Sequence, residues 1–394
     1  MFILFIHVHI QYIPIKYLQK NPRTTQKICL ALFVTVTMIS SVAFSVLRSH
    51  ASRRFFSSSP GFVMVSIKEA QSTTAKALKQ IGWDDQDANL QAEIMTAAEL
   101  CGNNQGLVKM YQPSMMAPSA DASKPTIERE TPSSAVVNAN QAPGMLAAVT
   151  AADLAADKVL NGDFAIAIVS SYNSSTSSGQ LAFYVNRMAE RGVIGVALAN
   201  SPEFVAAAAG GKPVFGTNPL AVAVPTSTGT FAFDMATSAV ALFGVLTAKS
   251  KGEALPPNVA YDAAGNWTTD ANKVMDGGAI ATFGGHKGAG LSLCVELLAG
   301  ALSGSAVLGQ VESKKAAKSW GHTFIAINPN MLVDDFPSKA ESILETVKAS
   351  GANIRIPGER SAKMALERQV AGEMPIPEKI WESICDCAKN GLGK

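Results

Sequence analysis

Charged residues are scarce in this chain of 394 residues, of which only 16% are charged. The first 62 residues hold seven of the 33 Lys and Arg residues and no acidic residue. The rest of the chain therefore has 26 basic against 31 acidic residues and is weakly acidic. A body without a basic stripe argues against binding to DNA or RNA. We expect no nucleic acid among the partners of this protein.

Cysteine and histidine are also few. The five cysteines are odd in number and show no framework spacing, and Cys385 and Cys387 lie too close together for the usual zinc pairs. We therefore predict no metal site and a reducing compartment. After residue 62 only His286 and His322 remain, so few imidazoles are left for acid–base chemistry.

The N-terminal region has the character of a targeting segment. Residues 28–47 are uncharged and mostly apolar, and such a run is long enough to span a bilayer. The Arg- and Ser-rich stretch that follows, up to residue 59, contains no acidic residue and is typical of organelle import sequences. We predict that residues 1–62 are removed before function, after import into the mitochondrion. The alternatives are import into a plastid, or retention of residues 28–47 as a membrane anchor. We expect the mature body not to be embedded in a membrane.

Hydrophobic residues make up 47% of the chain, which is enough to bury a large core in two lobes. Their periodicity predicts helices near both chain ends and alternating strands and helices between them. Strands are expected at 164–170, 193–199, 221–225, 231–235, 323–328 and 353–356. Helices are expected at 84–101, 145–160, 179–191, 237–250 and 338–350, with a Pro-rich linker at 113–132. No Gly-x-Gly-x-x-Gly separates a strand from a helix, so a Rossmann site is not indicated.

One glycine-rich stretch invites a functional interpretation. Residues 284–290 place four glycines around His286 and Lys287, immediately before an apolar segment with helical spacing. Glycine allows close approach of the backbone to a ligand, and a helix N-terminus beside an ammonium group favours anions. The stretch is therefore either an anion-binding loop or an ordinary junction between a loop and a helix.

Five motifs in a fixed order lie between residues 65 and 390. They are Gly216-Thr217-Asn218-Pro219, Phe233-Asp234-Met235-Ala236-Thr237-Ser238, Thr268-Thr269-Asp270, residues 284–290 and Pro357-Gly358-Glu359. Together they resemble the malate/L-lactate dehydrogenase-like family of NAD(P)-dependent oxidoreductases, which includes sulfolactate and ureidoglycolate dehydrogenases and cyclic imino-acid reductases. The resemblance implies NAD or NADP as cofactor, a small carboxylate as substrate, and a homodimer with its active site near the subunit interface.

The resemblance also implies an α/β fold, in the broad sense that includes α+β, without a Rossmann domain. A mixed, largely antiparallel sheet is expected to carry the nucleotide and to pack on a helical domain built from both chain ends. We expect the helical domain to comprise residues 65–125, 285–320 and 361–394. The sheet domain is then expected at 126–284 and 321–360.

The resemblance further implies a set of residues that line the cofactor. They are Gly179, Gln180, Ser201, Thr217, Asn218, Asp234, Met235, Ala236, Lys287 and, as a phosphate contact, Arg360. Hydroxyl, amide and ammonium groups at these positions suit a nucleotide. Two alternatives stay open: Thr217-Asn218-Pro219 as an ordinary turn, and Asp234 as a cap of the helix that follows it.

The sequence departs from the family at the expected catalytic positions. The family's Ser-His-Gly, followed by an Arg, is replaced here by Asn104-Gln105-Gly106, with Lys109 in the place of the Arg. The family's loop histidine, generally assigned as the proton donor or acceptor, is also missing, and Ser177 lies nearest to its position. Hydride transfer to a carbonyl or imine requires a proton for the developing oxyanion or amine.

Three interpretations of the missing histidines are open. Another group supplies the proton, with Lys109, Tyr172, His286 and Asp234 as candidates; or the substrate is an imine that is already protonated; or the protein binds the cofactor without turnover. We place Lys109, Gln105, Ser177 and His286 at the catalytic site. The expected activity is hydride transfer to or from C2 of a small 2-oxo, 2-hydroxy or cyclic 2-imino carboxylate. A malate- or lactate-type dehydrogenase and a non-catalytic nucleotide-binding paralogue are the alternatives.

Overall fold

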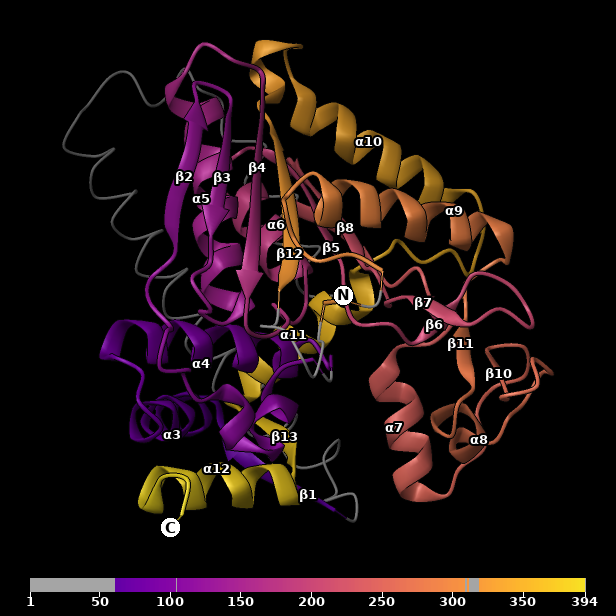
Figure 1. Ribbon diagram of the computed structural model, residues 1–394. Coiled ribbons are helices and arrows are strands. Elements are labelled where there is room, and N and C mark those ends of the chain that lie inside the picture. The colour runs from indigo at the N-terminus through magenta and orange to yellow at the C-terminus, as the bar shows by residue number, and fades with distance from the viewer. Residues whose placement is uncertain (1–60, 104, 309, 312–318, 394) are drawn as a thin grey trace, which may run out of the picture. The chain divides into compact units, whose positions relative to one another are not determined.

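A seven-stranded mixed sheet forms the centre of the fold (Figure 1). The computed structural model describes residues 61–103, 105–308, 310–311 and 319–393, so the apolar run at 28–47 and nearly all of the predicted targeting region lie outside the described residues. In spatial order the strands are β2 (Thr126–Thr131), β3 (Ser134–Asn138), β4 (Ile166–Ser174), β12 (Trp320–Ile327), β5 (Ile194–Ala199), β8 (Leu220–Thr226) and β9 (Gly229–Met235). The predicted largely antiparallel sheet is confirmed, because only β3 and β4 pair in parallel.

Two helices cover one face of this sheet. The chain leaves β3, passes through α5 (Gly144–Asn161) and returns as β4, which is the crossover that a parallel strand pair requires. Helix α6 (Ala182–Ala189) packs beside α5, against β5 and β8. Alanines occupy most of the buried positions of α5, and this lets the helix approach the strands closely. In β4 the alternation fits this arrangement, since Ala167 and Val169 are buried and Ile166 and Ile168 are exposed.

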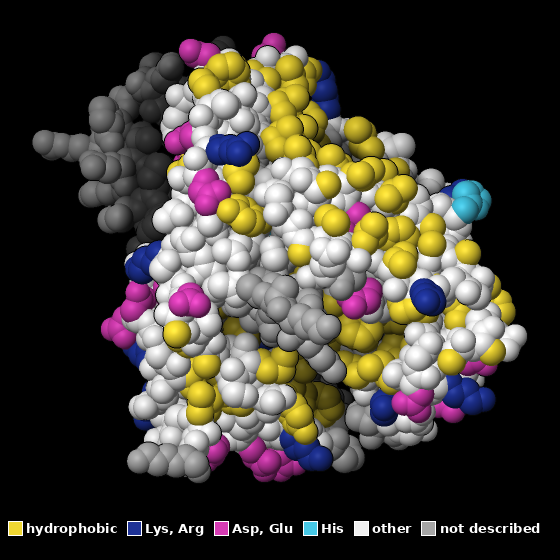
Figure 2. Space-filling model, viewed as in Figure 1, with side chains coloured by type: hydrophobic (Ala, Val, Ile, Leu, Met, Phe, Trp, Pro, Cys, Tyr) yellow, Lys and Arg dark blue, Asp and Glu magenta, His cyan; other side chains and the backbone are white. Residues whose placement is uncertain are grey.

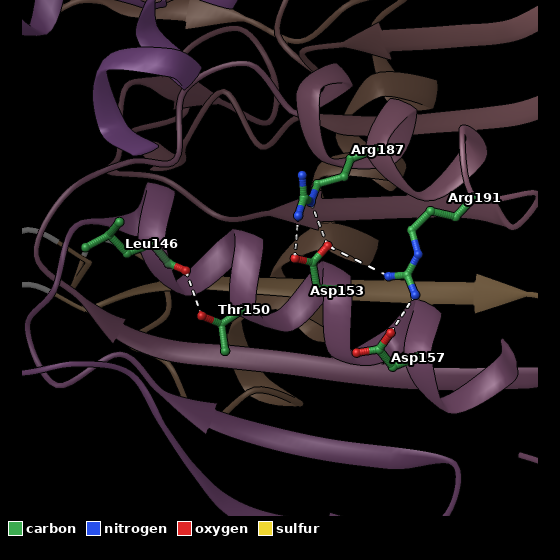
Figure 3. Close-up of polar contacts among 6 residues, drawn as sticks. All are labelled: Leu146, Thr150, Asp153, Asp157, Arg187 and Arg191. Atoms are coloured by element: carbon green, nitrogen blue, oxygen red, sulfur yellow. Dashed lines mark hydrogen bonds and ion pairs between the residues drawn. The ribbon is translucent and has the colours of Figure 1, made fainter. Parts of the chain in front are cut away.

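Ion pairs join α5 to α6 at the surface (Figure 3). Arg187 of α6 donates two hydrogen bonds to the carboxylate of Asp153 on α5, at 2.7 and 2.9 Å. One turn along, Arg191 donates to Asp157 at 2.5 Å. The Arg187 fork is the bidentate geometry that makes such pairs directional, so it orients α6 on α5.

A second group of helices is built from both ends of the described chain. It contains α3 (Ile67–Gln80), α4 (Asp85–Leu100) and α12 (Glu378–Asn390), with a short antiparallel pair of β1 (Phe62–Ser66) and β13 (Glu373–Pro377). Ser66 caps the N-terminus of α3, because its hydroxyl accepts a hydrogen bond from the backbone N–H of Glu69 at 3.2 Å. The proposed boundaries between helical and sheet domains remain a prediction.

A small lobe has its own apolar core. It contains the short strands β6 (Val205–Ala206), β7 (Pro213–Phe215), β10 (Ala260–Tyr261) and β11 (Ala279–Ala281), with α7 (Leu242–Lys251) and α8 (Ala271–Met275). The chain then forms α9 (His286–Val295) and a π-helical turn, η4 (Glu296–Ala301), which contacts β12, β5 and β4. The last long helices before α12 are α10 (Phe336–Ala349), which packs on β8, and α11 (Glu359–Ala371), which packs on α4.

The structure corrects three of the expected elements. The strand predicted at 353–356 is wrong, because the backbone N–H of Ile356 donates to the side chain of Glu359 instead of to a neighbouring strand. The helix expected from Thr237 begins only at Leu242, and the linker at 113–132 includes strand β2. Within the described ranges, no helix combines the length and the apolarity that a membrane crossing needs.

Candidate active site

A large cleft of about 1660 Å³ collects most of the residues that the sequence marked as functional. Its walls come from the loop after α4, the loop after β4, the turns that flank β5 and β8, the end of β9, and the near faces of α7, α10 and α11. The predicted site residues on these walls are Gln105, Lys109, Ser177, Gly179, Gln180, Ser201, Thr217, Asp234, Met235, Ala236 and Arg360. The cleft therefore unites segments that are more than 250 residues apart in the chain.

Lys109 and Ser177 meet inside this cleft. Lys109 lies on the 3₁₀ turn η2 (Leu107–Tyr111), and its Nζ donates to the backbone carbonyl of Ser177 at 3.2 Å and also to the Ser177 Oγ. Both residues are half-buried, so their hydrogen bonds are partly shielded from water while the two groups still line the cleft. Two of the residues that the sequence placed at the catalytic site, Lys109 and Ser177, therefore lie in direct contact.

Tight backbone packing holds the loop of Ser177 in place. Gly144, the first residue of α5, donates its N–H to the carbonyl of Thr176 at 3.1 Å, and a Cβ at Gly144 would lie only 2.4 Å from that oxygen. On the other side Gly179 has φ +81°, and a Cβ there would lie 3.0 Å from the carbonyl of Gln105. Glycine is needed at both positions because the backbone segments approach too closely for a side chain.

Asp234 lines the cleft and caps a helix, but a different helix from the one expected. Its Oδ2 accepts a hydrogen bond from the backbone N–H of Ala182, the first residue of α6, at 2.8 Å. Burial raises the pKa of Asp234 to about 6, although the N–H groups of Ala182 and Leu181 act to lower it. Asp234 therefore ties the end of β9 to the loop that contains Gly179 and Gln180.

The two turns beside β5 and β8 face the cleft with hydroxyl groups. Ser201 and Thr217 both line it, and their hydroxyl oxygens lie 3.3 Å apart. Asn218 is fully buried behind them and is not among the lining residues. Its side chain hydrogen-bonds to the backbone N–H of Ser201 and to groups on α9 and η4, so it acts on the cleft through Ser201.

His286 and Lys287, the two residues that glycines surround in the sequence, lie outside the described cleft wall. Gly284 and Gly285 have φ of +56° and +62°, as expected for glycines that set a sharp turn before a helix. His286 and Lys287 begin α9, and both are exposed. Neither is among the described residues that line the cleft, so the structure does not bring them together with Lys109 and Ser177.

The other candidate acids are also placed by the structure. No histidine is found among the described residues of the cleft wall. His322 of β12 is fully buried, and burial, together with the charge of Lys109, lowers its pKa to about 4, so the imidazole is neutral at physiological pH. Tyr172 donates its hydroxyl to Glu128 at 2.9 Å and does not line the cleft either.

Several lining residues gave no signal in the sequence. Apolar groups reach the cleft from the 3₁₀ turns and from α7, and additional cations reach it from α10 and α12. They are Tyr111, Met115, Leu242, Phe243, Leu246, Lys348 and Lys379. Their positions follow from long-range packing, for which the residue types alone give no sign.

Comparisons with known proteins point to one family. Residues 65–385 match the family model described as malate/L-lactate dehydrogenase. The L-sulfolactate dehydrogenase of Methanothermobacter thermautotrophicus is 37% identical over 270 residues, which are 67% of this chain and 77% of that protein. The Δ1-pyrroline-2-carboxylate reductase 2 of Burkholderia multivorans is 31% identical over 339 residues, 82% of this chain and 96% of that protein.

The chain belongs to the malate/L-lactate dehydrogenase family. It is an oxidoreductase that depends on a nicotinamide cofactor. The solved structure of the Δ1-piperideine-2-carboxylate reductase of Pseudomonas syringae pvar. tomato superposes with a TM-score of 0.75 at 26% identity, covering 82% of this chain and 99% of that one. The predicted family, fold class and enzyme class are therefore confirmed.

Proposed function

We propose that this family member transfers a hydride to or from C2 of a small 2-oxo, 2-hydroxy or cyclic 2-imino carboxylate, with Lys109 and Ser177 at the reacting end of the cleft. The observation that carries the proposal is the contact between the Lys109 ammonium and Ser177 inside the cleft. An ammonium group binds a carboxylate or stabilises a developing oxyanion. The alternative is a malate- or lactate-type dehydrogenase in the narrow sense.

The cleft suits a nicotinamide dinucleotide. Its volume of about 1660 Å³ exceeds that of an ordinary small-molecule pocket, and both hydroxyl groups and cations line it. Ser201 and Thr217 would hold the cofactor through their hydroxyls, Met235 and Ala236 through their backbone, and Arg360 through a phosphate. When bound, NAD or NADP supplies or accepts the hydride.

The proton-transfer groups favour an imine among the possible substrates. Of the candidate proton donors, Lys109 and Asp234 line the described part of the cleft. The proton for a forming alkoxide would therefore come from Lys109, directly or through the Ser177 hydroxyl, or from Asp234. A cyclic imine that is already protonated needs no such donor. The similarity to a Δ1-pyrroline-2-carboxylate reductase keeps cyclic imines among the substrates to test, and the similarity to an L-sulfolactate dehydrogenase keeps 2-hydroxy acids among them.

We propose further that the protein is a homodimer. Exposed leucines gather on α9 and on the π-helical segment beside it, namely Leu291, Leu293, Leu297, Leu298 and Leu302. Figure 2 shows hydrophobic side chains concentrated over the part of the surface where Figure 1 places α9. Apolar patches of this kind usually mark an interface.

For the cell compartment, we propose the mitochondrion, on the basis of the Arg- and Ser-rich segment 48–59. Residues 1–62 fused to a fluorescent protein should direct it to mitochondria. Accumulation in plastids or retention in a membrane would support the alternatives.

The catalytic proposal is tested with NADH and NADPH against a panel of 2-oxo and cyclic 2-imino acids, following the loss of nicotinamide absorbance. Lys109→Met should lower kcat/KM by about 10²-fold, because it removes both an anion-binding and a proton-donating group. Lys76→Met, at an exposed lysine of α3, is the matched control and should keep wild-type activity. Cofactor binding without turnover of any acid in the panel would contradict the proposed function.

A further inference from the structure

Glu296 is a buried carboxylate behind the cleft wall. It is the first residue of the π-helical turn η4, and only 3% of its surface is exposed. Burial raises the pKa of Glu296, whereas hydrogen bonds from Asn218, Leu308 and Asn200 act to lower it. Burying a carboxylate costs free energy unless its oxygens accept hydrogen bonds, and these three residues supply the donors.

The two oxygens of Glu296 serve different donors. Oε1 accepts from the Asn218 Nδ2 at 2.9 Å, and Oε2 accepts from the backbone N–H of Leu308 at 3.4 Å. A third hydrogen bond comes from the side chain of Asn200. Only an ionised carboxylate accepts at both oxygens and donates at neither, so no other side chain of this size satisfies the arrangement.

The two asparagines transmit this contact to the cleft. Asn218 accepts the backbone N–H of Ser201 at 3.2 Å, and its own N–H donates to the Ser201 Oγ at 3.3 Å. Asn200 precedes Ser201 directly, and its Oδ1 accepts the N–H of Gly321 at 2.9 Å. Thr217 directly precedes Asn218, and its hydroxyl oxygen lies 3.3 Å from the Ser201 hydroxyl oxygen.

The helix is shaped around the same contact. In η4 the Leu302 N–H donates to the Leu297 carbonyl at 2.9 Å, an i to i+5 bond, and such π turns are rare and concentrate at functional sites. Gly300 is the residue that leaves room behind Glu296. A Cβ there would lie 2.7 Å from the Val307 Cγ1, 3.1 Å from the Asn200 Nδ2 and 3.4 Å from the Glu296 Oε2.

We propose that Glu296 is a positioning residue for the cofactor. Its carboxylate holds Asn218 and Asn200 and thereby sets the two turns that present Ser201 and Thr217 to the cleft. The residue itself touches neither the substrate nor the cofactor. The inference rests on the proposed function insofar as it assigns the cofactor to Ser201 and Thr217.

The primary test is Glu296→Gln in the purified protein. A Gln side chain has only one acceptor oxygen, so its NH₂ group must take the place of one of the two carboxylate oxygens. That NH₂ group would then point at another donor, either the Asn218 Nδ2 or the backbone N–H of Leu308. We expect the cofactor KM to rise about tenfold, while kcat at saturating cofactor and the substrate KM change less than about twofold. Gly300→Ala, which crowds the same contact, should act in the same direction.

A rescue separates positioning from mere stability. In the double variant Glu296→Gln/Asn218→Asp the donor and acceptor roles between the two side chains are exchanged, because a carboxylate at 218 accepts from the Gln NH₂ and from the N–H of Ser201. The exchange removes the donor to the Ser292 carbonyl, so recovery is expected to be partial. This variant should recover part of the lost cofactor affinity relative to Glu296→Gln. Val159→Ala, a truncation at the far end of α5, controls for lost stability and should leave the cofactor KM unchanged.

Direct titration with NADH or NADPH distinguishes this inference from the proposed function. Wild-type binding without turnover would overturn the proposed function only, and the Kd of each variant would still report on Glu296. An unchanged cofactor Kd in Glu296→Gln would overturn the positioning role, as would equal losses in kcat and in both KM values. A wild-type protein that binds neither cofactor would overturn both.

Discussion

At the scale of single residues, the structure puts buried ionisable groups close to the cleft. Glu99, near the end of α4, is buried, and this burial raises its pKa to about 7, although the charge of Arg368 acts in the opposite direction. Arg368 of α11 in turn donates hydrogen bonds to the carbonyls of Glu99 and Leu100. Cys101, the residue that follows α4, lines the cleft. The protonation state of Glu99 beside Arg368 therefore matters close to the site.

Glu99 should make stability fall as the pH rises. Between its ordinary pKa of 4.5 and the folded value of about 7, the folded protein binds more protons than the unfolded chain. The associated stability is therefore complete below pH 4.5 and is lost as the pH rises through about 7. The measurement is the free energy of urea unfolding at pH 5 and pH 8. We expect its decrease between these pH values to be smaller in Glu99→Gln than in the wild type, by up to about 3 kcal/mol.

The control is Glu93→Gln, at an exposed position on the same helix. It should keep the pH dependence of the wild type. An identical slope in wild type and Glu99→Gln would show that Glu99 does not titrate in this range. Burial also raises the pKa of Asp234. Asp234 is present in both the wild type and Glu99→Gln, so its contribution to the pH dependence of stability cancels when the two are compared.

At the scale of elements, helix α5 and the loop after β4 form one unit. The first residue of α5 packs directly on the backbone of residues 176–178, and the Lys109 ammonium closes the loop from the other side. Helix α6 is joined to α5 by the Arg187–Asp153 pair and to β9 by the Asp234 cap. The end of the cleft that holds Lys109 and Ser177 therefore depends on how these two helices sit on the sheet.

Replacement of Gly144 by Ala should displace that loop. The new Cβ would meet the Thr176 carbonyl at 2.4 Å and the Ser178 backbone nitrogen at 2.8 Å, and neither backbone atom can move without the loop. We expect a loss of about 1–3 kcal/mol in stability and at least about a tenfold loss in kcat/KM. Thermal unfolding and the cofactor-oxidation assay measure the two effects.

Gly162→Ala provides the matched control at the other end of α5. Its Cβ would also crowd a backbone oxygen, that of Lys158 at 2.6 Å, but this site is remote from the loop. It should lower stability and preserve kcat/KM. If both glycine variants lost activity in proportion to stability, the special role of the Gly144 contact would be refuted.

At the scale of the whole molecule, the exposed leucines of α9 and η4 are the surface feature that most needs an explanation. Leu297 in η4 and Leu302 directly after it are 56% and 55% exposed, and η4 also holds Glu296, which is buried behind the turns of Ser201 and Thr217. A partner seated on this surface would contact the same helix that supports the site.

Leu297→Glu should therefore weaken or abolish the dimer, because it places a charge in an apolar interface. Light scattering coupled to size-exclusion chromatography should show a dimer for the wild type and a monomer for the variant at micromolar concentration. Leu160→Glu, an exposed leucine near the end of α5, should remain dimeric. A dimeric Leu297→Glu protein would show that this surface is not the interface.

The order of five motifs in the sequence was enough to predict the family and the non-Rossmann fold class. The family resemblance also predicted a catalytic site at Lys109, Gln105, Ser177 and His286, of which the first three line one cleft in the structure. These properties follow from local patterns whose positions along the chain are specific. Other properties depended on the tertiary structure. It placed His286 and Lys287 outside the described cleft wall, directed Asp234 to α6, and buried Asn218 against Glu296. Each of these contacts, or missing contacts, involves residues about 50 or more positions apart, and packing between elements decides which of them meet.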